Sequence, residues 1–310
     1  MWPDVLVSQA RLCTDMRAFI SGRCANIACM NRVVPLVRTR ALVLRRFDHV
    51  PGVAHRDPER ERATWYAVAF VEAGAFRLRT SGAWREVTTD WLFVTSPSLE
   101  FSCAHDEEHP RDCCLSVVYS AEAVESARSA VALSPAPLRP LTNRHAFLRH
   151  ALQRCAPGDE ARVEALAGAL LGSLAGPAAR TPLYRPDRLA WYARRVERAK
   201  HMIDACYAEP LSLSMLAHDA GMSLFHFARI FAELEGRPPH RVLTDVRLAQ
   251  AAARLRDGAG VTDTCFAVGF GSLSHFVTTF RRRYGVRPSE LSRTGSAQAG
   301  VLCRQDGRHR

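Results

Sequence analysis

Long apolar runs are missing from this 310-residue sequence. No stretch approaches the roughly 18 consecutive apolar residues that a transmembrane helix needs. The first forty residues carry scattered arginines where a secretion signal would have a continuous apolar segment. These absences predict a cytoplasmic globular protein with no membrane partner. Its length suggests two domains of ordinary size.

Motifs that mark many enzymes are also absent. The sequence has no glycine-rich phosphate loop, no nucleophile elbow and no convincing Ser-His-Asp set. We therefore predict no enzyme activity, no catalytic residue and no cofactor. The ten cysteines form no CxxC pair, which favours reduced thiols over a disulfide framework. A redox sensor remains an alternative, because it needs only one exposed cysteine of low pKa.

Basic charge is concentrated toward the C-terminus. Residues 185–293 hold 17 Lys and Arg against 11 acidic residues, whereas residues 41–184 hold 16 Arg against 17 acidic residues. This distribution is typical of a neutral sensing domain joined to a module that binds a polyanion. On charge alone, a solvated basic surface explains the pattern equally well.

Residues 41–119 show the alternation expected of strands. Phe76, Leu78 and Thr80 alternate with arginines, and short apolar runs cover residues 65–71, 91–95 and 114–119. Glycine and proline separate these segments. The spacing predicts an antiparallel sandwich or small barrel. No element is predicted for residues 1–40, within which Met16 and Met30 are alternative starts.

A helical period replaces the strand pattern between residues 144 and 174. The segment Pro157-Gly158-Asp159 separates two predicted helices. Their apolar stripes consist of Phe147, Leu148 and Leu152 in the first helix and Val163, Leu166, Leu170 and Leu174 in the second. Either stripe could pack on the β-rich domain or on a second subunit, so a homodimer is an open alternative. The proline-containing segment 176–188 reads as a linker.

A duplication follows the linker. Seven residues recur at one fixed offset of 49 positions, which indicates that one supersecondary unit occurs twice. The repeated residues are Ser223, Leu224, His226, Phe227, Phe231, Gly236 and Pro239 in the first copy and Ser272, Leu273, His275, Phe276, Phe280, Gly285 and Pro288 in the second.

Each copy reads as helix, tight turn and helix. In the first copy, Gly221 is expected to end one helix and Ser223 to cap the next. The second helix of each copy has an apolar back, formed by Phe227, Ile230, Phe231 and Leu234 in one copy and by Phe276, Phe280 and Tyr284 in the other. A long helix over residues 241–257, buried through Leu248, Ala252 and Leu255, would join them. Two recognition helices held about 34 Å apart can enter successive major grooves.

These segments resemble the AraC/XylS family of transcription regulators. The resemblance covers residues 190–293 and rests on LSLSMLAHDAGMSLFHFARIFAELEGRPP and VGFGSLSHFVTTFRRRYGVRPSEL. It implies a regulator, more often an activator, that binds double-stranded promoter DNA and acts with RNA polymerase. The N-terminal part looks like the cupin-like sensing domain of many members, which implies a small-molecule effector.

The expected fold class is α+β. It combines a cupin-like N-terminal β-barrel with accessory helices and an all-α C-terminal domain with two helix-turn-helix units. The expected boundaries are an N-terminal extension at 1–40, a sensing and dimerisation domain at 41–175, a linker at 176–188, a DNA-binding domain at 189–293 and a basic tail at 294–310.

The resemblance also implies roles for the exposed positions of both recognition helices. Base edges would be contacted by Phe225, Ala228, Arg229, Ser272, Leu273, Ser274, His275 and Thr278, and phosphates by Arg281, Arg282 and Arg283. Arg229 is the sharpest candidate, because a guanidinium can grip guanine O6 and N7 together. Its alternatives are an ordinary surface arginine or an ion-pair partner. His226 and His275 could equally be packing residues.

Three departures from the family pattern involve four positions. Thr264 and Cys265 replace an apolar residue and alanine, which predicts looser packing of the second unit's first helix. Thr278 stands where some members have arginine, and Leu291 replaces an aromatic residue. We therefore expect the second unit to contribute less specificity than the first.

Two rival functions remain. Cys103, His105, His109 and Cys113 lie in the loop CAHDEEHPRDC, and their side chains suit zinc. Their spacing matches no usual zinc finger, so no metal site is predicted. A metal-dependent cupin enzyme is the remote alternative, although the two closely spaced histidines and following glutamate of such sites are absent. A DNA-binding regulator without an effector is the nearer one.

Overall fold

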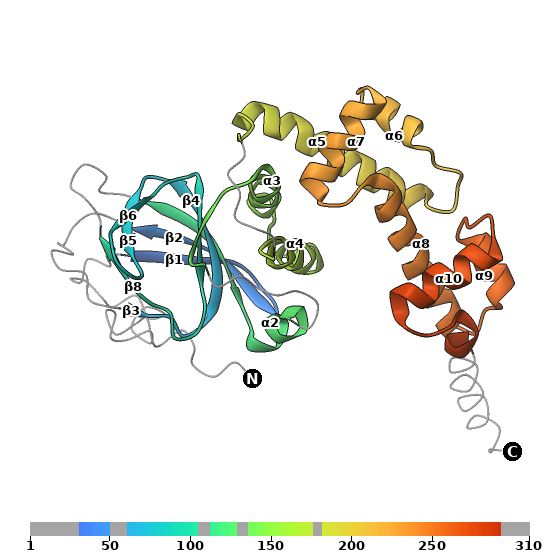
Figure 1. The fold of residues 1–310 in the computed structure, drawn as a ribbon, viewed down its shortest axis with the longest axis horizontal. Coiled ribbons are helices and arrows are strands. Elements are labelled where there is room, and N and C mark those ends of the chain that lie inside the picture. Colours follow the sequence, from blue (N-terminus) through green and yellow to red (C-terminus); the bar gives the residue numbers. More distant parts are fainter. Residues whose placement is uncertain (1–30, 50–60, 105–111, 129–135, 176–181, 293–310) are drawn as a thin grey trace, which may run out of the picture. The chain divides into compact units, whose positions relative to one another are not determined.

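The computed structural model describes residues 31–49, 61–104, 112–128, 136–175 and 182–292 (Figure 1). The chain divides into two compact units, Met1–Leu183 and Tyr184–Arg310. The described part of the first unit contains all the described strands together with helices, and that of the second is helical. The prediction of a β-rich N-terminal domain with accessory helices and an all-α C-terminal domain is confirmed at this level.

The larger sheet of the first unit has six strands in the order β1-β2-β9-β4-β7-β10. Every pairing within it is antiparallel. Its strands are β1 (Asn31–Arg38), β2 (Leu42–His49), β4 (Tyr66–Ala73), β7 (Trp91–Thr95), β9 (Cys113–Tyr119) and β10 (Leu138–Pro140). Pairing partners such as β2 and β9 are distant in sequence, so the sheet depends on long-range contacts.

The smaller sheet has four strands in the order β3-β8-β5-β6. They are β3 (Glu61–Arg62), β5 (Phe76–Arg79), β6 (Arg85–Val87) and β8 (Glu100–Ala104). In β5, Phe76 and Leu78 are buried while Arg77 and Arg79 are exposed, which confirms the predicted alternation. One core joins the two sheets, because Val71 and Cys114 of the larger sheet cluster with Phe76, Leu78, Val87 and Phe101 of the smaller one.

The two sheets face each other without exchanging strand pairs among the described segments. Two layers over one core are the arrangement of the predicted antiparallel sandwich, and a cupin-like barrel stays a prediction. The chain leaves β4 at Gly74, whose left-handed φ of 75° allows a sharp turn. It then enters β5 in the other sheet. Strands β4 and β5 thus lie in different layers, which alternation within each strand does not reveal.

The described part of the first unit also contains the helices α2 (Ala121–Arg128), α3 (Asn143–Leu152) and α4 (Glu160–Ser173). Both predicted stripes are buried. The hydroxyl of Tyr119 in β9 donates to the carbonyl of Ala167 in α4 at 2.9 Å, and Arg149 in α3 donates to the carbonyl of Val71 in β4 at 3.1 Å. The stripes are covered within the unit itself. They therefore offer no free apolar surface to a second subunit.

Two segments differ from the sequence-based expectation. Strand β1 lies within residues 1–40, where no element is predicted. Pro35 and a register shift between Pro35 and Val37 interrupt the alternation that would indicate a strand. Within the expected linker 176–188, a helix begins at Pro186, because the fixed φ of proline suits the first turn. Residues 176–181 lie outside the described part, and the domain boundaries stay predictions.

The second unit is built on two long helices. They are α5 (Pro186–Cys206) and α8 (Pro239–Arg256), which frame the shorter helices α6 (Leu213–Asp219), α7 (Leu224–Glu235), α9 (Val261–Ala267) and α10 (Leu273–Tyr284). Helix α8 corresponds to the predicted joining helix, and Leu248, Ala252 and Leu255 are buried as expected. Among the described helices, none combines the length and apolar composition needed to span a bilayer.

Candidate nucleic-acid interface

The two helix pairs α6–α7 and α9–α10 share one turn geometry. At the end of α6, Gly221 has a φ of 61°, and the N–H of Met222 donates to the carbonyl of Ala217 at 3.0 Å. At the end of α9, Gly269 has a φ of 87°, and the N–H of Phe270 donates to the carbonyl of Cys265 at 3.0 Å. These are the glycine and the back-bond of a Schellman ending, so the predicted role of Gly221 is confirmed.

The recognition helices α7 and α10 have the same length and lie at the offset of the repeat. Each contains 12 residues, and each ends at a left-handed glycine, Gly236 or Gly285. Their starts differ. Ser272 caps α10 by accepting the N–H of His275 at 3.4 Å, whereas Ser223 makes no side-chain cap hydrogen bond. Ser223 thus occupies the predicted N-cap position of α7 without the side-chain hydrogen bond of a capping serine.

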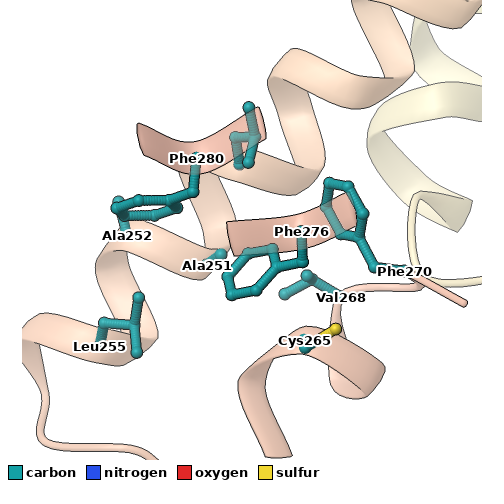
Figure 2. Close-up of a cluster of buried hydrophobic side chains, with 9 residues drawn as sticks. Ala251, Ala252, Leu255, Cys265, Val268, Phe270, Phe276 and Phe280 are labelled. Atoms are coloured by element: carbon teal, nitrogen blue, oxygen red, sulfur yellow. The ribbon is translucent and has the colours of Figure 1, made fainter. Parts of the chain in front are cut away.

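Each recognition helix has a buried back. In α7, the predicted residues Phe227, Ile230, Phe231 and Leu234 are buried. In α10, Phe276 and Phe280 are fully buried and Tyr284 is partly buried. Figure 2 shows Phe276 and Phe280 among Ala251, Ala252 and Leu255 of α8, Cys265 of α9 and Val268, which directly follows α9. A packed back fixes the helix and leaves its other face available, as groove reading requires.

Helix α9, the first helix of the second helix-turn-helix unit, is better packed than its sequence suggests. Thr264 and Cys265 are both fully buried, and Cys265 belongs to the cluster beneath α10. The expected looser packing is therefore wrong as regards burial. Threonine in place of the family's apolar residue does have one consequence, because the Thr264 hydroxyl is buried without a hydrogen-bond partner.

The residues predicted to contact bases lie on the open faces of α7 and α10. The side chain of Phe225 is 86% exposed. Exposed positions also include Arg229, Ser272, Leu273, Ser274, His275 and Thr278, while Ala228 is half-buried. The structure thus brings these residues to the solvent-facing sides of two equivalent helices. Which base edges they contact stays a prediction.

Arg229 is exposed and also has an acidic neighbour. Its Nη1 lies 3.7 Å from Oε2 of Glu233, one turn farther along α7. The distance exceeds a good hydrogen bond, and 60% of the arginine side chain is accessible. The ion-pair alternative is therefore realised without removing Arg229 from the open face. His226 packs instead, with Nε2 3.0 Å from the Tyr192 hydroxyl.

The three arginines predicted to contact phosphates do not share one environment. Arg281 and Arg282 line a groove of about 710 Å³ that Val261, Thr278 and Arg287 also line. Arg283 is placed differently, because its Nε lies 4.0 Å from Asp245 and its guanidinium lies 5.6 Å from the ring centre of Tyr284.

Arg287 is the groove residue that the sequence pattern does not single out. It stands between Gly285 and Pro288, inside the motif that ends the second helix-turn-helix unit. That position reads as part of a turn, and only folding brings its side chain beside Arg281 and Arg282. Three cationic side chains in one groove favour a polyanion such as a DNA backbone.

Metal binding finds no support in the part of the chain that the structure describes. No group of three or more His, Cys, Asp and Glu is placed there to hold an ion. Cys103 and Cys113 are half-buried, but His105 and His109 lie outside the described residues. Cys113 is a poor candidate for a reactive thiolate, because burial and the neighbouring Asp48 and Glu72 raise its pKa to about 12.

Known proteins match this chain mainly in its second unit. A family model described as a helix-turn-helix domain matches residues 216–294. The chain is 31% identical over 108 residues to the virulence regulon transcriptional activator VirF of Yersinia enterocolitica, with 34% of this chain and 40% of that protein covered. It is 31% identical over 103 residues to the transcriptional regulator ExsA of Pseudomonas aeruginosa, with 33% and 37% covered.

One solved structure likewise matches only part of this chain. The probable AraC family transcriptional regulator of Rhodopseudomonas palustris is 28% identical, with 33% of this chain and 97% of that chain covered and a TM-score of 0.32. The chain thus spans 40% or less of the length of the two curated relatives above.

Proposed function

Through its C-terminal domain the chain belongs to the AraC/XylS family, and we propose that it is a sequence-specific DNA-binding transcription regulator. The observation that carries this proposal is the pair of equivalent helices α7 and α10. Each has a fully packed back and an open front, and a groove with three arginines lies beside the second. A packed helix with a free face, next to cationic side chains, is suited to read a major groove while its neighbours hold the backbone.

The proposed base readers are the eight residues on the open faces of α7 and α10. Arg229 is the principal one, because its accessible guanidinium can donate two hydrogen bonds to guanine. Arg281 and Arg282 are the proposed phosphate contacts, joined by Arg287. Arg283 has the weaker claim, since Asp245 competes for it.

Activation is the proposed direction of regulation, with RNA polymerase as the partner at the promoter. Support comes from the similarity to VirF, a transcriptional activator. The first unit is the proposed sensing domain, of cupin-like type, for a small-molecule effector. It is a separate compact unit with its own core and helical layer. An effector can act only if its affinity differs between two states of the protein.

The test is selection of bound fragments from sheared genomic DNA of the source organism. The full chain is used at near-physiological salt with excess nonspecific competitor, with and without an extract of small metabolites. We expect a few promoter-proximal fragments to be retained. Arg229→Ala should abolish this preference, because a lost bidentate contact removes about 1–3 kcal/mol of discrimination. Arg254→Ala is the matched control, because Arg254 is an exposed arginine of α8 outside the proposed interface.

The outcomes separate the parts of the proposal. Enrichment that Arg229→Ala destroys and Arg254→Ala preserves supports a sequence-specific regulator. Enrichment that requires the extract supports an effector, and enrichment that ignores it favours a regulator without one. Retention of DNA with no preferred fragment under either condition contradicts the proposed sequence specificity.

A further inference from the structure

One side of the recognition helix α7 is tied to the chain that leads into α5. The hydroxyl of Tyr184 donates to Oε2 of Glu233 at 2.7 Å. The same oxygen lies 3.7 Å from Nη1 of Arg229. The Glu233 carboxylate therefore neighbours both a tyrosine hydroxyl and the guanidinium proposed to read a base. The contact joins residues 49 positions apart in sequence.

Tyr184 is seated on a packed base. Its ring meets the ring of Tyr192 edge-on, with centres 5.0 Å apart. Tyr192 is fully buried; its hydroxyl lies 3.0 Å from His226 Nε2 and accepts the Nε–H of Arg188 at 3.1 Å. These contacts fix the aromatic pair against α7. The hydroxyl of Tyr184 thus approaches Glu233 from a supported position.

The pKa of Tyr184 reflects both neighbours. Burial and the hydrogen bond to Glu233 raise the pKa of Tyr184, and Arg229 opposes that rise. A carboxylate held by a tyrosine hydroxyl gives the guanidinium a fixed partner on one side. Its other N–H groups are left for a guanine.

We propose that Tyr184 and Glu233 are positioning residues for Arg229, with the tyrosine hydroxyl holding the carboxylate that orients the guanidinium. This inference rests on the proposed DNA-reading function. Tyr184 is also the first residue of the second compact unit. The chain that enters this unit is thus linked to Glu233 by a hydrogen bond, and Glu233 lies within ion-pair distance of Arg229.

The experiment uses the full chain, a promoter fragment from the selection and versions of it with each base pair replaced in turn. Arg229→Ala first identifies the base pair whose identity ceases to matter. Tyr184→Phe and Glu233→Gln are then expected to lower discrimination at that pair by about 5-fold, the effect of losing one hydrogen bond of ordinary net strength. Discrimination at other pairs and affinity for nonspecific DNA should stay unchanged. In the Arg229→Ala background, Tyr184→Phe should have no further effect.

Two matched controls accompany these variants. Tyr207→Phe removes a tyrosine hydroxyl elsewhere in the unit, and Glu235→Gln neutralises an acid of α7 that pairs with Lys200 and Arg237. Neither should change discrimination at the Arg229 base pair.

Opposite results are distinguishable. If Arg229→Ala abolishes discrimination at one pair while Tyr184→Phe and Glu233→Gln leave it intact, positioning is overturned and the proposed function stands. Equal losses of affinity on all DNA, or equal losses in the Arg229→Ala background, indicate a general structural role and also overturn it. If Arg229→Ala changes no preference, both the base reader and its positioning residues are overturned.

Discussion

The two helix-turn-helix units have nearly the same backbone but opposite charge on their recognition helices. At the position of the proposed reader, α7 has Arg229 and α10 has Thr278. One turn later α7 has Glu233, whereas α10 has Arg282. The repeat therefore preserves the packed back and reverses the charge of the front. If both helices read DNA as proposed, this difference predicts that the first unit supplies more of the base discrimination and the second more of the backbone affinity.

The turns of the two units differ as well. A methyl group added at Gly221 would meet no atom within 4 Å, whereas one added at Gly269 would lie 2.7 Å from the carbonyl oxygen of Ala208. Arg247 of α8 holds the same segment by donating to the carbonyls of Tyr207 and Glu209 at 2.7 and 2.8 Å. The second turn is thus locked against the end of α5, while the first is open.

The largest expected effects test whether the backs of the helices are equivalent. Phe227→Ala and Phe276→Ala should each lower the free energy of unfolding by about 3–5 kcal/mol, because both rings are fully buried. Urea denaturation of the full chain, followed by the helical circular dichroism signal, measures both. If the free energy of unfolding falls several times more in one variant than in the other, the cores of the two helix-turn-helix units are not equivalent.

Substitution of the two turn glycines should reveal the difference between the two turns. Gly221→Ala forces a left-handed alanine into open space, at a cost of about 1–2 kcal/mol. Gly269→Ala adds a clash with the Ala208 carbonyl, which raises the cost by about a further 1–3 kcal/mol. The same denaturation experiment compares the two variants. Equal costs would contradict the locked second turn.

The features that could be predicted from the sequence are those with a local signal. The repeat at a fixed offset and the stripe of Phe227, Ile230, Phe231 and Leu234 predicted both recognition helices and their buried backs. The alternation predicted for residues 76–80 is also observed in β5. These patterns reflect one helix or one strand meeting one core, so a short window of sequence contains them.

Features that join distant segments could not be predicted in this way. The two-sheet arrangement depends on β9 pairing with both β2 and β4, and alternation within a strand names no partner. The contact of Glu233 with Tyr184 required the fold, as did the meeting of Arg283 with Asp245. The open faces of the candidate site were predictable, but the contacts that modify its arginines were not.

The salt dependence of DNA binding tests the division of charge. Arg282→Ala should reduce the slope of log affinity against log salt by about 0.9, the value for one phosphate contact. Arg283→Ala should change the slope less, because Asp245 already neighbours that guanidinium. Binding to nonspecific duplex DNA over a range of salt concentrations measures both, with Arg254→Ala as the control. A larger change for Arg283→Ala than for Arg282→Ala would contradict this prediction. It would place the phosphate contact on the side of α10 that carries Arg283.

The smallest expected difference lies at the helix starts. Ser272→Ala removes a hydroxyl that accepts the N–H of His275 and should cost about 1 kcal/mol of stability. Ser223→Ala removes a hydroxyl with no such bond and should cost less than about 0.5 kcal/mol. Because Ser272 is also a proposed base contact, its stability effect is measured without DNA and its binding effect separately. Equal stability losses would mean that Ser223 caps α7 in solution, and the two units would then be alike at their starts and distinguished by charge and turn alone.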